Sequence, residues 1–394
     1  MALMPLNTRN EFSRDLGVVD HAMRHAVDAG YAKQKNAHWI IWLQFCTESK
    51  LDPFLTDKKD PIPYLQIFAQ RYRDGRLAPR GKPVTSKYVS NVLASVGQNF
   101  SGLGAKDPRY TDYDGKIDLR LRRLFKFWAK DDAPPKRVKP LPITLVRFLL
   151  NQAYSSNLPM AFKSRALADT ICIAFFYLLR PTEYSGDPKQ AFSLGDVHLY
   201  IGTRRLDIAL EPLHDLARAT SVRLHFTIQK NQRKGEVIAQ GISGDPYCCP
   251  VRSIIRFVRS HRLYFQRQNL PFDDTVRLAS YYDLADTRFH VRASDVTSDV
   301  RFAARANRHL TGITPTDLSA RSARAGGAMA LLCGGVDSDT IQLLGRWHGA
   351  SMLRYLHMEA RPIFNRLAEK MFNHGTYSFL PTTWVPVDYV ADEV

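Results

Sequence analysis

The chain has 394 residues, which is too long for one ordinary core, so two domains are expected. Its formal net charge is +17. So much positive charge repels itself in the folded state and therefore points to a polyanionic partner, with a merely basic protein as the alternative. No apolar run approaches the roughly 20 residues of a membrane span. The first residues lack the apolar core of a signal peptide, so neither a membrane nor a secreted location is expected.

The five cysteines are odd in number and scattered, which favours a reducing compartment. The adjacent pair Cys248 and Cys249 does not have the spacing of metal ligands. All five are therefore interpreted as packing residues, and the sequence predicts neither a metal nor a cofactor.

Residues 1 to about 12 are expected to form a loose arm, and apolar residues then recur at helical spacing from Leu16 to Cys46. Three more helices are predicted over 64–72, 85–103 and 117–129. The last of these has cations around its apolar positions: Arg120, Arg122, Arg123, Lys126 and Lys130. Residues 1–130 are thus predicted to be an all-helical unit with a basic face that binds DNA.

Residues 131–142, DDAPPKRVKPLP, are the predicted linker. Proline fixes φ and removes a backbone donor, so this segment is stiff and not part of a helix or sheet. Its cations are Lys136, Arg137 and Lys139. The segment is either a solvated hinge or a hinge that lies along a phosphate backbone, and the two interpretations are compatible.

Residues 143–394 are predicted to be a second, mainly helical domain with a small antiparallel sheet. Helices are expected over 143–153, 164–179, 250–265 and 293–306, and strands over 196–201, 221–229 and 236–240, with 266–292 left ambiguous. A basic turn, Lys230 to Gly235, joins the last two strands and includes Lys234. Arg180 follows the apolar second helix, which Pro181 ends.

Cations and proton-handling groups gather in residues 316–358 and around Arg180 and Lys230, which points to phosphate chemistry. Arginine binds two phosphoryl oxygens in a fork and stays charged, which suits Arg180, Arg321 and Arg324. A lysine such as Lys230 can protonate a leaving oxygen, and a phenol such as Tyr355 can attack phosphorus. Each residue alone has a plainer interpretation: Arg180 as a helix cap paired with Glu183, the others as surface or core residues.

The order of these residues resembles the tyrosine recombinase (phage-integrase-like) family. An arginine with a glutamate three residues later is followed by a lysine in a β-turn, a second arginine, Gly-Arg-Trp, and a tyrosine eight residues after the tryptophan. The ending GRWHGASMLRY is similar to that of Crypton- and DIRS-type mobile-element recombinases. The resemblance covers most of residues 143–375 and implies a helical core-binding domain followed by an α+β catalytic domain with a C-terminal tail.

The resemblance implies a role for each matching position. Arg180 and Arg324 would be the catalytic arginines, Lys230 the general acid, Trp347 the residue at the His-or-Trp position and Tyr355 the nucleophile. His348 and Glu183 are alternative or auxiliary residues. Arg321 stands where the family usually has a histidine, and a guanidinium cannot easily take the tyrosine's proton.

The family implies a DNA strand transfer through a 3′-phosphotyrosyl intermediate, with double-stranded DNA as partner and no cofactor. It further implies a tetramer on DNA, a monomer or dimer when free, and a nuclear location if the source is eukaryotic, or otherwise a cytoplasmic one. Three alternatives stay open: an inactive copy that binds DNA without cutting it, a type IB topoisomerase, for which the chain is short, and a non-enzymatic DNA-binding regulator.

Overall fold

The computed structural model describes residues 6–25, 29–110, 115–134, 138–155, 161–186, 190–227, 235–347 and 352–353. Two compact units divide the chain, Met1–Pro135 and Lys136–Val394, with their boundary inside the proline-rich segment 131–142. No helix among the described residues is both long and apolar enough to cross a membrane.

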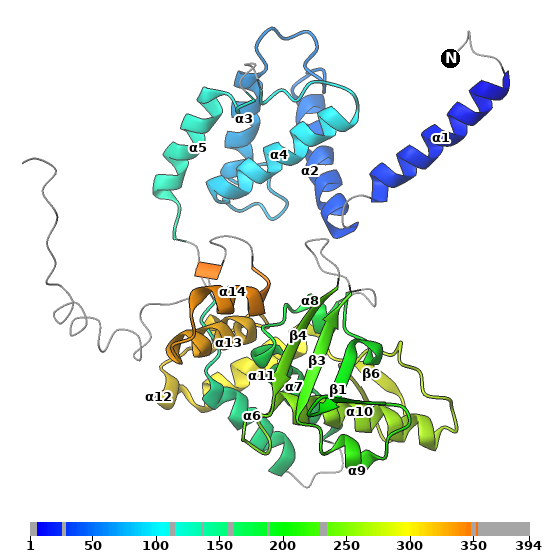
Figure 1. The fold of residues 1–394 in the computed structure, drawn as a ribbon. Helices are drawn as coiled ribbons and strands as arrows, with labels where there is room; N and C mark the ends of the chain where they lie inside the picture. The colour runs from blue at the N-terminus through cyan, green and yellow to red at the C-terminus, as the bar shows by residue number, and fades with distance from the viewer. Residues whose placement is uncertain are drawn as a thin grey trace, which may run out of the picture. The chain divides into compact units, whose positions relative to one another are not determined.

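The regular structure of the first unit is all helical in the residues that the structure describes (Figure 1). Its helices are α1 Leu6–His25, α2 Ala29–Glu48, α3 Ile62–Arg73, α4 Ser86–Gly102 and α5 Leu119–Asp131. The expectation of a loose arm over residues 1 to about 12 was wrong from Leu6 onward, where α1 begins. Phe12, Leu16 and Val18 of α1 are exposed, so this helix forms without burying them in the unit's core.

Side-chain caps and an aromatic core hold this unit together. Thr85 and Asp118 cap α4 and α5 by accepting hydrogen bonds from backbone amides two or three residues further on. Trp42 and Phe68 are fully buried and meet edge to face with their ring centroids 5.1 Å apart. In α2 and α3 the predicted helical spacing therefore reflects true core faces.

In its described ranges the second unit contains one four-stranded antiparallel sheet, a two-stranded hairpin and surrounding helices. The sheet has the order β2-β1-β3-β4. The helices and strands of the second unit are, in chain order, α6 Ile143–Ser155, α7 Phe162–Phe176, α8 Thr182–Ser185, η1 Leu194–Asp196, β1 Val197–Ile201, β2 Arg204–Leu206, α9 Leu213–Leu216, β3 Ser221–Phe226, β4 Glu236–Gly241, α10 Pro250–Arg267, β5 Ser280–Tyr282, β6 Arg288–His290, α11 Ala293–Ala306, α12 Arg308–Thr311, η2 Pro315–Asp317, α13 Ser322–Cys333 and α14 Ser338–Gly345. The predicted fold class, mainly α with a small antiparallel sheet, is confirmed.

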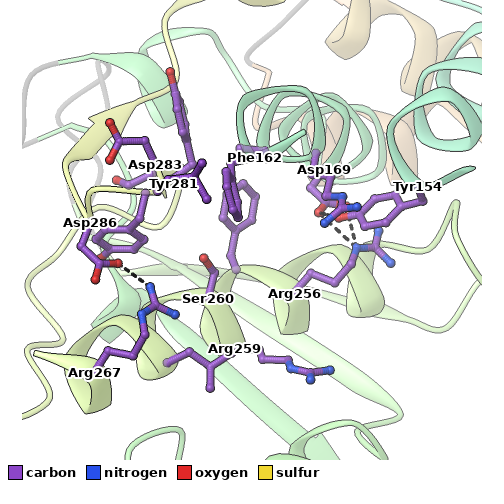
Figure 2. Close-up of a pocket in the computed structure, with 17 residues that line it drawn as sticks. Tyr154, Phe162, Asp169, Arg256, Arg259, Ser260, Arg267, Tyr281, Asp283 and Asp286 are labelled. Carbon is purple, nitrogen blue, oxygen red and sulfur yellow. Dashed lines mark hydrogen bonds and ion pairs between the residues drawn. The ribbon is translucent and has the colours of Figure 1, made fainter. Parts of the chain in front are cut away.

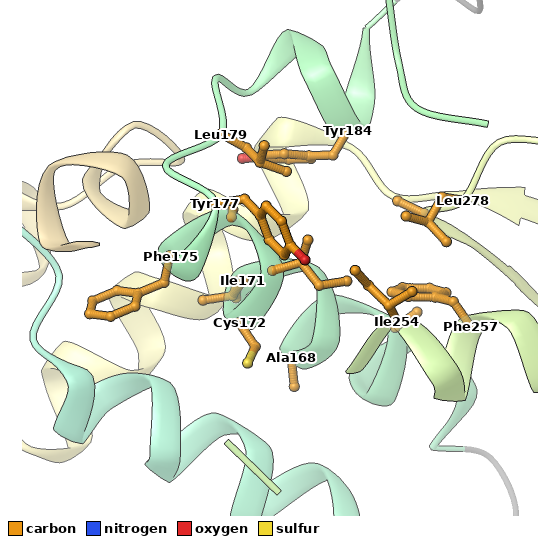
Figure 3. Packing of buried hydrophobic residues seen from close by; sticks show 14 of the residues in the cluster. Ala168, Ile171, Cys172, Phe175, Tyr177, Leu179, Tyr184, Ile254, Phe257 and Leu278 are labelled. Carbon is orange, nitrogen blue, oxygen red and sulfur yellow. The ribbon is translucent and has the colours of Figure 1, made fainter. Parts of the chain in front are cut away.

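Helix α7 is the centre of this unit because every residue from Ala166 to Phe175 is buried. A helix that is apolar on all sides needs neighbours on all sides. Helices α6, α10 and α13 pack against it, and Figure 3 shows side chains of α7 and α10 interlocking in this core. The helix ends at Phe176, earlier than predicted, because Leu178 adopts a left-handed backbone with φ of 50°.

Candidate active site

The corner that follows α7 carries Arg180 and Glu183. The Arg180 amide donates to Glu183 Oε2 at 2.7 Å, and Arg180 Nη1 donates to Oε1 at 2.9 Å. Glu183 lies in the first turn of α8, and its side chain is buried. The Arg180 side chain keeps 20% of its surface exposed, so it presents an edge of positive charge to solvent.

Arg324, on α13, also contacts the corner that follows α7. Its Nη1 donates to the Leu178 carbonyl at 2.8 Å, and its Nη2 donates to the Gly345 carbonyl. The guanidinium lies over the Trp347 ring, 4.4 Å from the centroid. Arg324 is only 3% exposed, so these two carbonyls and the tryptophan hold its guanidinium inside the protein.

Arg346 follows α14 with a left-handed backbone, φ 53° and ψ 44°. Its Nη2 forms an ion pair with Glu183 Oε2 at 2.9 Å, and its own carbonyl accepts from Arg180 Nη2 at 3.4 Å. The guanidinium also lies 3.8 Å from the ring centroid of Phe226, the last residue of β3. Arg346 is the arginine of the Gly-Arg-Trp motif, and it was not among the residues predicted to be functional.

Burial lowers the pKa of Arg346 to about 10; Glu183 opposes the shift, and nearby Arg180 adds to it. The side chain therefore stays charged at neutral pH. Its Nε is buried and has no hydrogen-bond partner among the residues that the structure describes. Its sequence signal was available: a lone arginine between the apolar end of α14 and a tryptophan needs a buried partner.

Arg180 and Arg324 are brought together by these contacts. They donate to the carbonyls of two consecutive residues, Arg346 and Gly345. Since consecutive residues are spaced by about 3.8 Å at Cα, the two guanidinium groups lie within about 12 Å of each other. Residues separated by more than 140 positions thus share one corner.

Trp347 forms the apolar wall of the site. It is 7% exposed and packs with Leu178, Ala328, Ile341 and Met352. A Cβ at Gly345 would lie 1.8 Å from the Trp347 ring, so only glycine fits before this arginine and tryptophan. The tryptophan holds the face of Arg324 through stacking.

Arg321 lies in a different environment from Arg324, although one helical turn separates them. It is the exposed N-cap residue of α13, and its amide donates to Ser319 Oγ at 3.3 Å. Within the described part of the chain, its side chain makes no hydrogen bond or ion pair. Arg321 is thus free to meet an anion from solvent, as the more buried Arg324 is not.

Several predicted residues fall outside the described part of the chain, so the structure places none of them. These are the catalytic candidates Lys230, His348 and Tyr355 and the DNA-binding candidates Lys136, Arg137 and Lys234. Strand β3 ends at Phe226 and β4 begins at Glu236, so Lys230 belongs to the segment of the chain that joins these two strands.

The DNA-binding candidates of α5 differ in whether their side chains already have partners within the protein. Arg120 is paired with Asp118, with Nε to Oδ1 at 3.0 Å, and with Asp60, with Nη1 to Oδ2 at 2.5 Å. Arg122 donates through Nε to the Ile117 carbonyl at 2.8 Å, and is exposed, as are Arg123 and Lys126. In the second unit, Lys139 pairs with Asp317 at 3.4 Å.

Comparisons with protein-family models and with curated proteins find no match. Among solved structures, the chain is similar to the Tn1549 transposon integrase in complex with transposon right end DNA, at 14% identity and a TM-score of 0.48, covering 91% of this chain and 98% of that one. For the same integrase in complex with circular intermediate DNA, the identity is 13% and the TM-score 0.49, and the match covers 90% of this chain and 97% of that one. For XerA recombinase, the identity is 14% and the TM-score 0.34, and the match covers 91% of this chain and 97% of that one. At such values the chemistry has to be inferred from this chain's own side chains.

Proposed function

We propose that this protein is a tyrosine-type site-specific DNA recombinase of a mobile element. The observation that carries the proposal is the corner where Arg180 and Arg324 donate to the consecutive carbonyls of Arg346 and Gly345, with Trp347 against Arg324. Two arginines directed to one place suit a phosphodiester, whose transition state gathers negative charge on the phosphoryl oxygens. The net charge of +17 supports a polyanionic substrate.

In the proposed reaction, the phenolic oxygen of Tyr355 bonds to phosphorus as the bond from phosphorus to the 5′-oxygen breaks. Lys230 donates a proton to that 5′-oxygen. Arg180 and Arg324 bind the phosphoryl oxygens, with Arg324 exchanging a carbonyl for one of them. A 5′-hydroxyl from another strand then attacks the phosphotyrosine and releases Tyr355, so the bond energy is conserved without a cofactor.

The first unit would hold DNA through the exposed cations of α5, and the second would carry out the chemistry. The strand exchange needs four cleaved strands, which favours a tetramer on DNA formed from free monomers or dimers. The Lys136-Arg137-Val138-Lys139 cluster supports a nuclear location.

Covalent trapping on nicked "suicide" duplexes tests the proposal. Duplexes taken from the DNA that flanks the chain's own coding sequence are incubated with the protein and run on a denaturing gel. Wild type should form a protein–DNA adduct, and Tyr355→Phe and Arg324→Ala should not. Tyr247→Phe is the matched control because Tyr247 is 48% exposed and its ring stacks on Tyr154, which is not part of the corner. An adduct with Tyr355→Phe would show that the nucleophile is another residue.

The second candidate is a copy that binds DNA without cutting it, and Arg321 is the observation that favours it. A guanidinium stays protonated and cannot accept the phenol's proton. Arg321→His places a group with a pKa near 6.5 at this exposed position. If wild type forms no adduct but Arg321→His does, with a rate that rises across pH 6 to 7, the inactive-copy proposal is correct.

A further inference from the structure

A cavity of about 620 Å³ lies at the beginning of α7, at the other end of that helix from Arg180 (Figure 2). The length of α7 separates the two places by roughly 20 Å along its axis. The end of α6, the start of α7, one side of α10 and the turn after β5 line it. Its volume falls in the range of small-molecule sites, about 300–1,000 Å³.

One end of the cavity is cationic. Arg256 Nε donates to Asp169 Oδ1 at 2.9 Å, and the Tyr154 hydroxyl donates to Asp169 Oδ2 at 2.5 Å. Asp169 is buried, so this bond network fixes Arg256 and neutralises its charge. Arg256 lies 4.7 Å from the Tyr154 ring centroid and Arg165 lies 5.6 Å from it.

Two arginines at this end have no carboxylate partner among the residues that the structure describes. Arg165 donates through Nε to the Ala153 carbonyl at 3.3 Å but has no carboxylate partner within the described ranges. Arg259, one helical turn after Arg256, is exposed and makes no hydrogen bond or ion pair with another residue that the structure describes. Arg165 beside the Tyr154 ring, together with the positive charge that Arg259 adds to the same lining, suits an anion.

The opposite end is acidic. Asp286 accepts from Arg267 Nη2 at 2.5 Å and from Gln268 Nε2 at 2.8 Å. Asp283 Oδ1 accepts from the amides of Ala285 and Thr287, while its other oxygen has no hydrogen bond to a residue in the described ranges. This end therefore offers a carboxylate oxygen to a hydrogen-bond donor.

Aromatic and small polar side chains lie between the two ends. Figure 2 shows the Phe162 ring and Ser260 between Tyr154 and Arg256 on one side and Asp283, Asp286 and Arg267 on the other. Tyr281 adds a second ring, stacked on Phe289 with centroids 5.5 Å apart. A flat apolar ring would find a surface here.

We infer that this cavity binds a mononucleotide-sized anion that combines three features. A phosphate or similar anion lies between Arg165 and Arg259, a flat ring packs on Phe162, and a hydroxyl or amino donor reaches Asp283. The inference does not depend on the proposed DNA chemistry, because none of these residues belongs to the corner at Arg180.

Isothermal titration of the full-length protein with adenosine 5′-monophosphate tests the inference. Saturable binding at one site is expected. Arg165→Gln and Arg259→Gln should each weaken it about tenfold or more, the effect of one charge-assisted hydrogen bond. Phe162→Leu keeps the apolar volume but removes the flat ring, and should weaken the nucleotide more than inorganic phosphate.

The control is Arg305→Gln, which removes an exposed arginine of α11 outside the cavity and should leave the affinity unchanged. Inorganic phosphate and adenosine, titrated separately, should each bind more weakly than the nucleotide. No saturable binding at millimolar nucleotide, or equal weakening by Arg305→Gln, would overturn the inference. A loss of duplex DNA affinity in Arg165→Gln and Arg259→Gln without a loss of nucleotide affinity would assign the arginines to a DNA surface instead.

Discussion

The carboxylate of Glu183 and the guanidinium of Arg346, 163 residues apart in the sequence, are 2.9 Å from each other. Their side chains are 6% and 1% exposed. The same carboxylate holds Arg180 through its other oxygen. Glu183 thus joins the corner after α7 to the Gly-Arg-Trp segment, and the orientation of Arg180 depends on both.

Glu183→Gln should therefore destabilise the protein strongly. The substitution keeps the shape of the side chain but leaves Arg346 as a buried, uncompensated charge, which costs about 3–5 kcal/mol. Urea unfolding measures the loss. Adding Arg346→Met removes the stranded charge, so the double variant should be more stable than Glu183→Gln alone. A loss below about 1 kcal/mol in the single variant would mean that the pair is not buried as described.

Gly327→Ala should displace α13 and with it Arg324. A Cβ at position 327 would lie 2.0 Å from the Phe175 carbonyl oxygen, a contact that requires the helices to separate. Overpacking of this kind costs about 1–3 kcal/mol, measured by thermal unfolding, and should lower adduct formation as well. Gly334→Ala is the matched control: its nearest atoms are 3.4 Å away, and its stability should change little. Equal effects of the two substitutions would contradict the close approach.

Removal of single cations from α5 should separate DNA-binding residues from structural ones. Arg123→Gln and Lys126→Gln remove exposed charges, and each should reduce the log–log salt slope of DNA binding by about 0.9. Arg120→Gln should change the slope less, because Asp118 and Asp60 already engage that guanidinium. Fluorescence anisotropy across a salt series measures all three. The prediction fails if Arg120→Gln has the largest effect on the slope.

Asp299→Asn should stabilise the protein at neutral pH. Burial raises the pKa of Asp299 to about 6, with Lys163 opposing the shift and Asp295 adding to it. Because the folded state binds this proton more tightly than the unfolded state, the carboxyl costs stability progressively as pH rises from about 4 to 6, and the cost stays constant above. Asn removes the charge, so a gain of about 1 kcal/mol is expected at pH 7.5, discounted for partial exposure. Most of the gain in stability should disappear at pH 4.5. Urea unfolding at the two pH values measures it. An equal gain at both pH values would show that the carboxyl is not the cause.

The sequence by itself determined the helices with strong apolar periodicity and the small antiparallel sheet, because spacing and local pattern act within a few residues. It also placed Arg180 beside Glu183, since three residues on a tight corner leave few other partners. The roles of Lys230 and Tyr355 stay predictions from the sequence, because both lie outside the described residues.

Only the tertiary structure decided which arginines are buried and which groups accept their hydrogen bonds. Arg324 depends on a carbonyl 146 residues away, and Arg346 on one 169 residues away. A buried cation is tolerated only where such distant groups converge, and no local pattern records that convergence. For the same reason residue type alone suited both Arg321 and Arg324 to phosphate binding, whereas the fold exposes the first and buries the second.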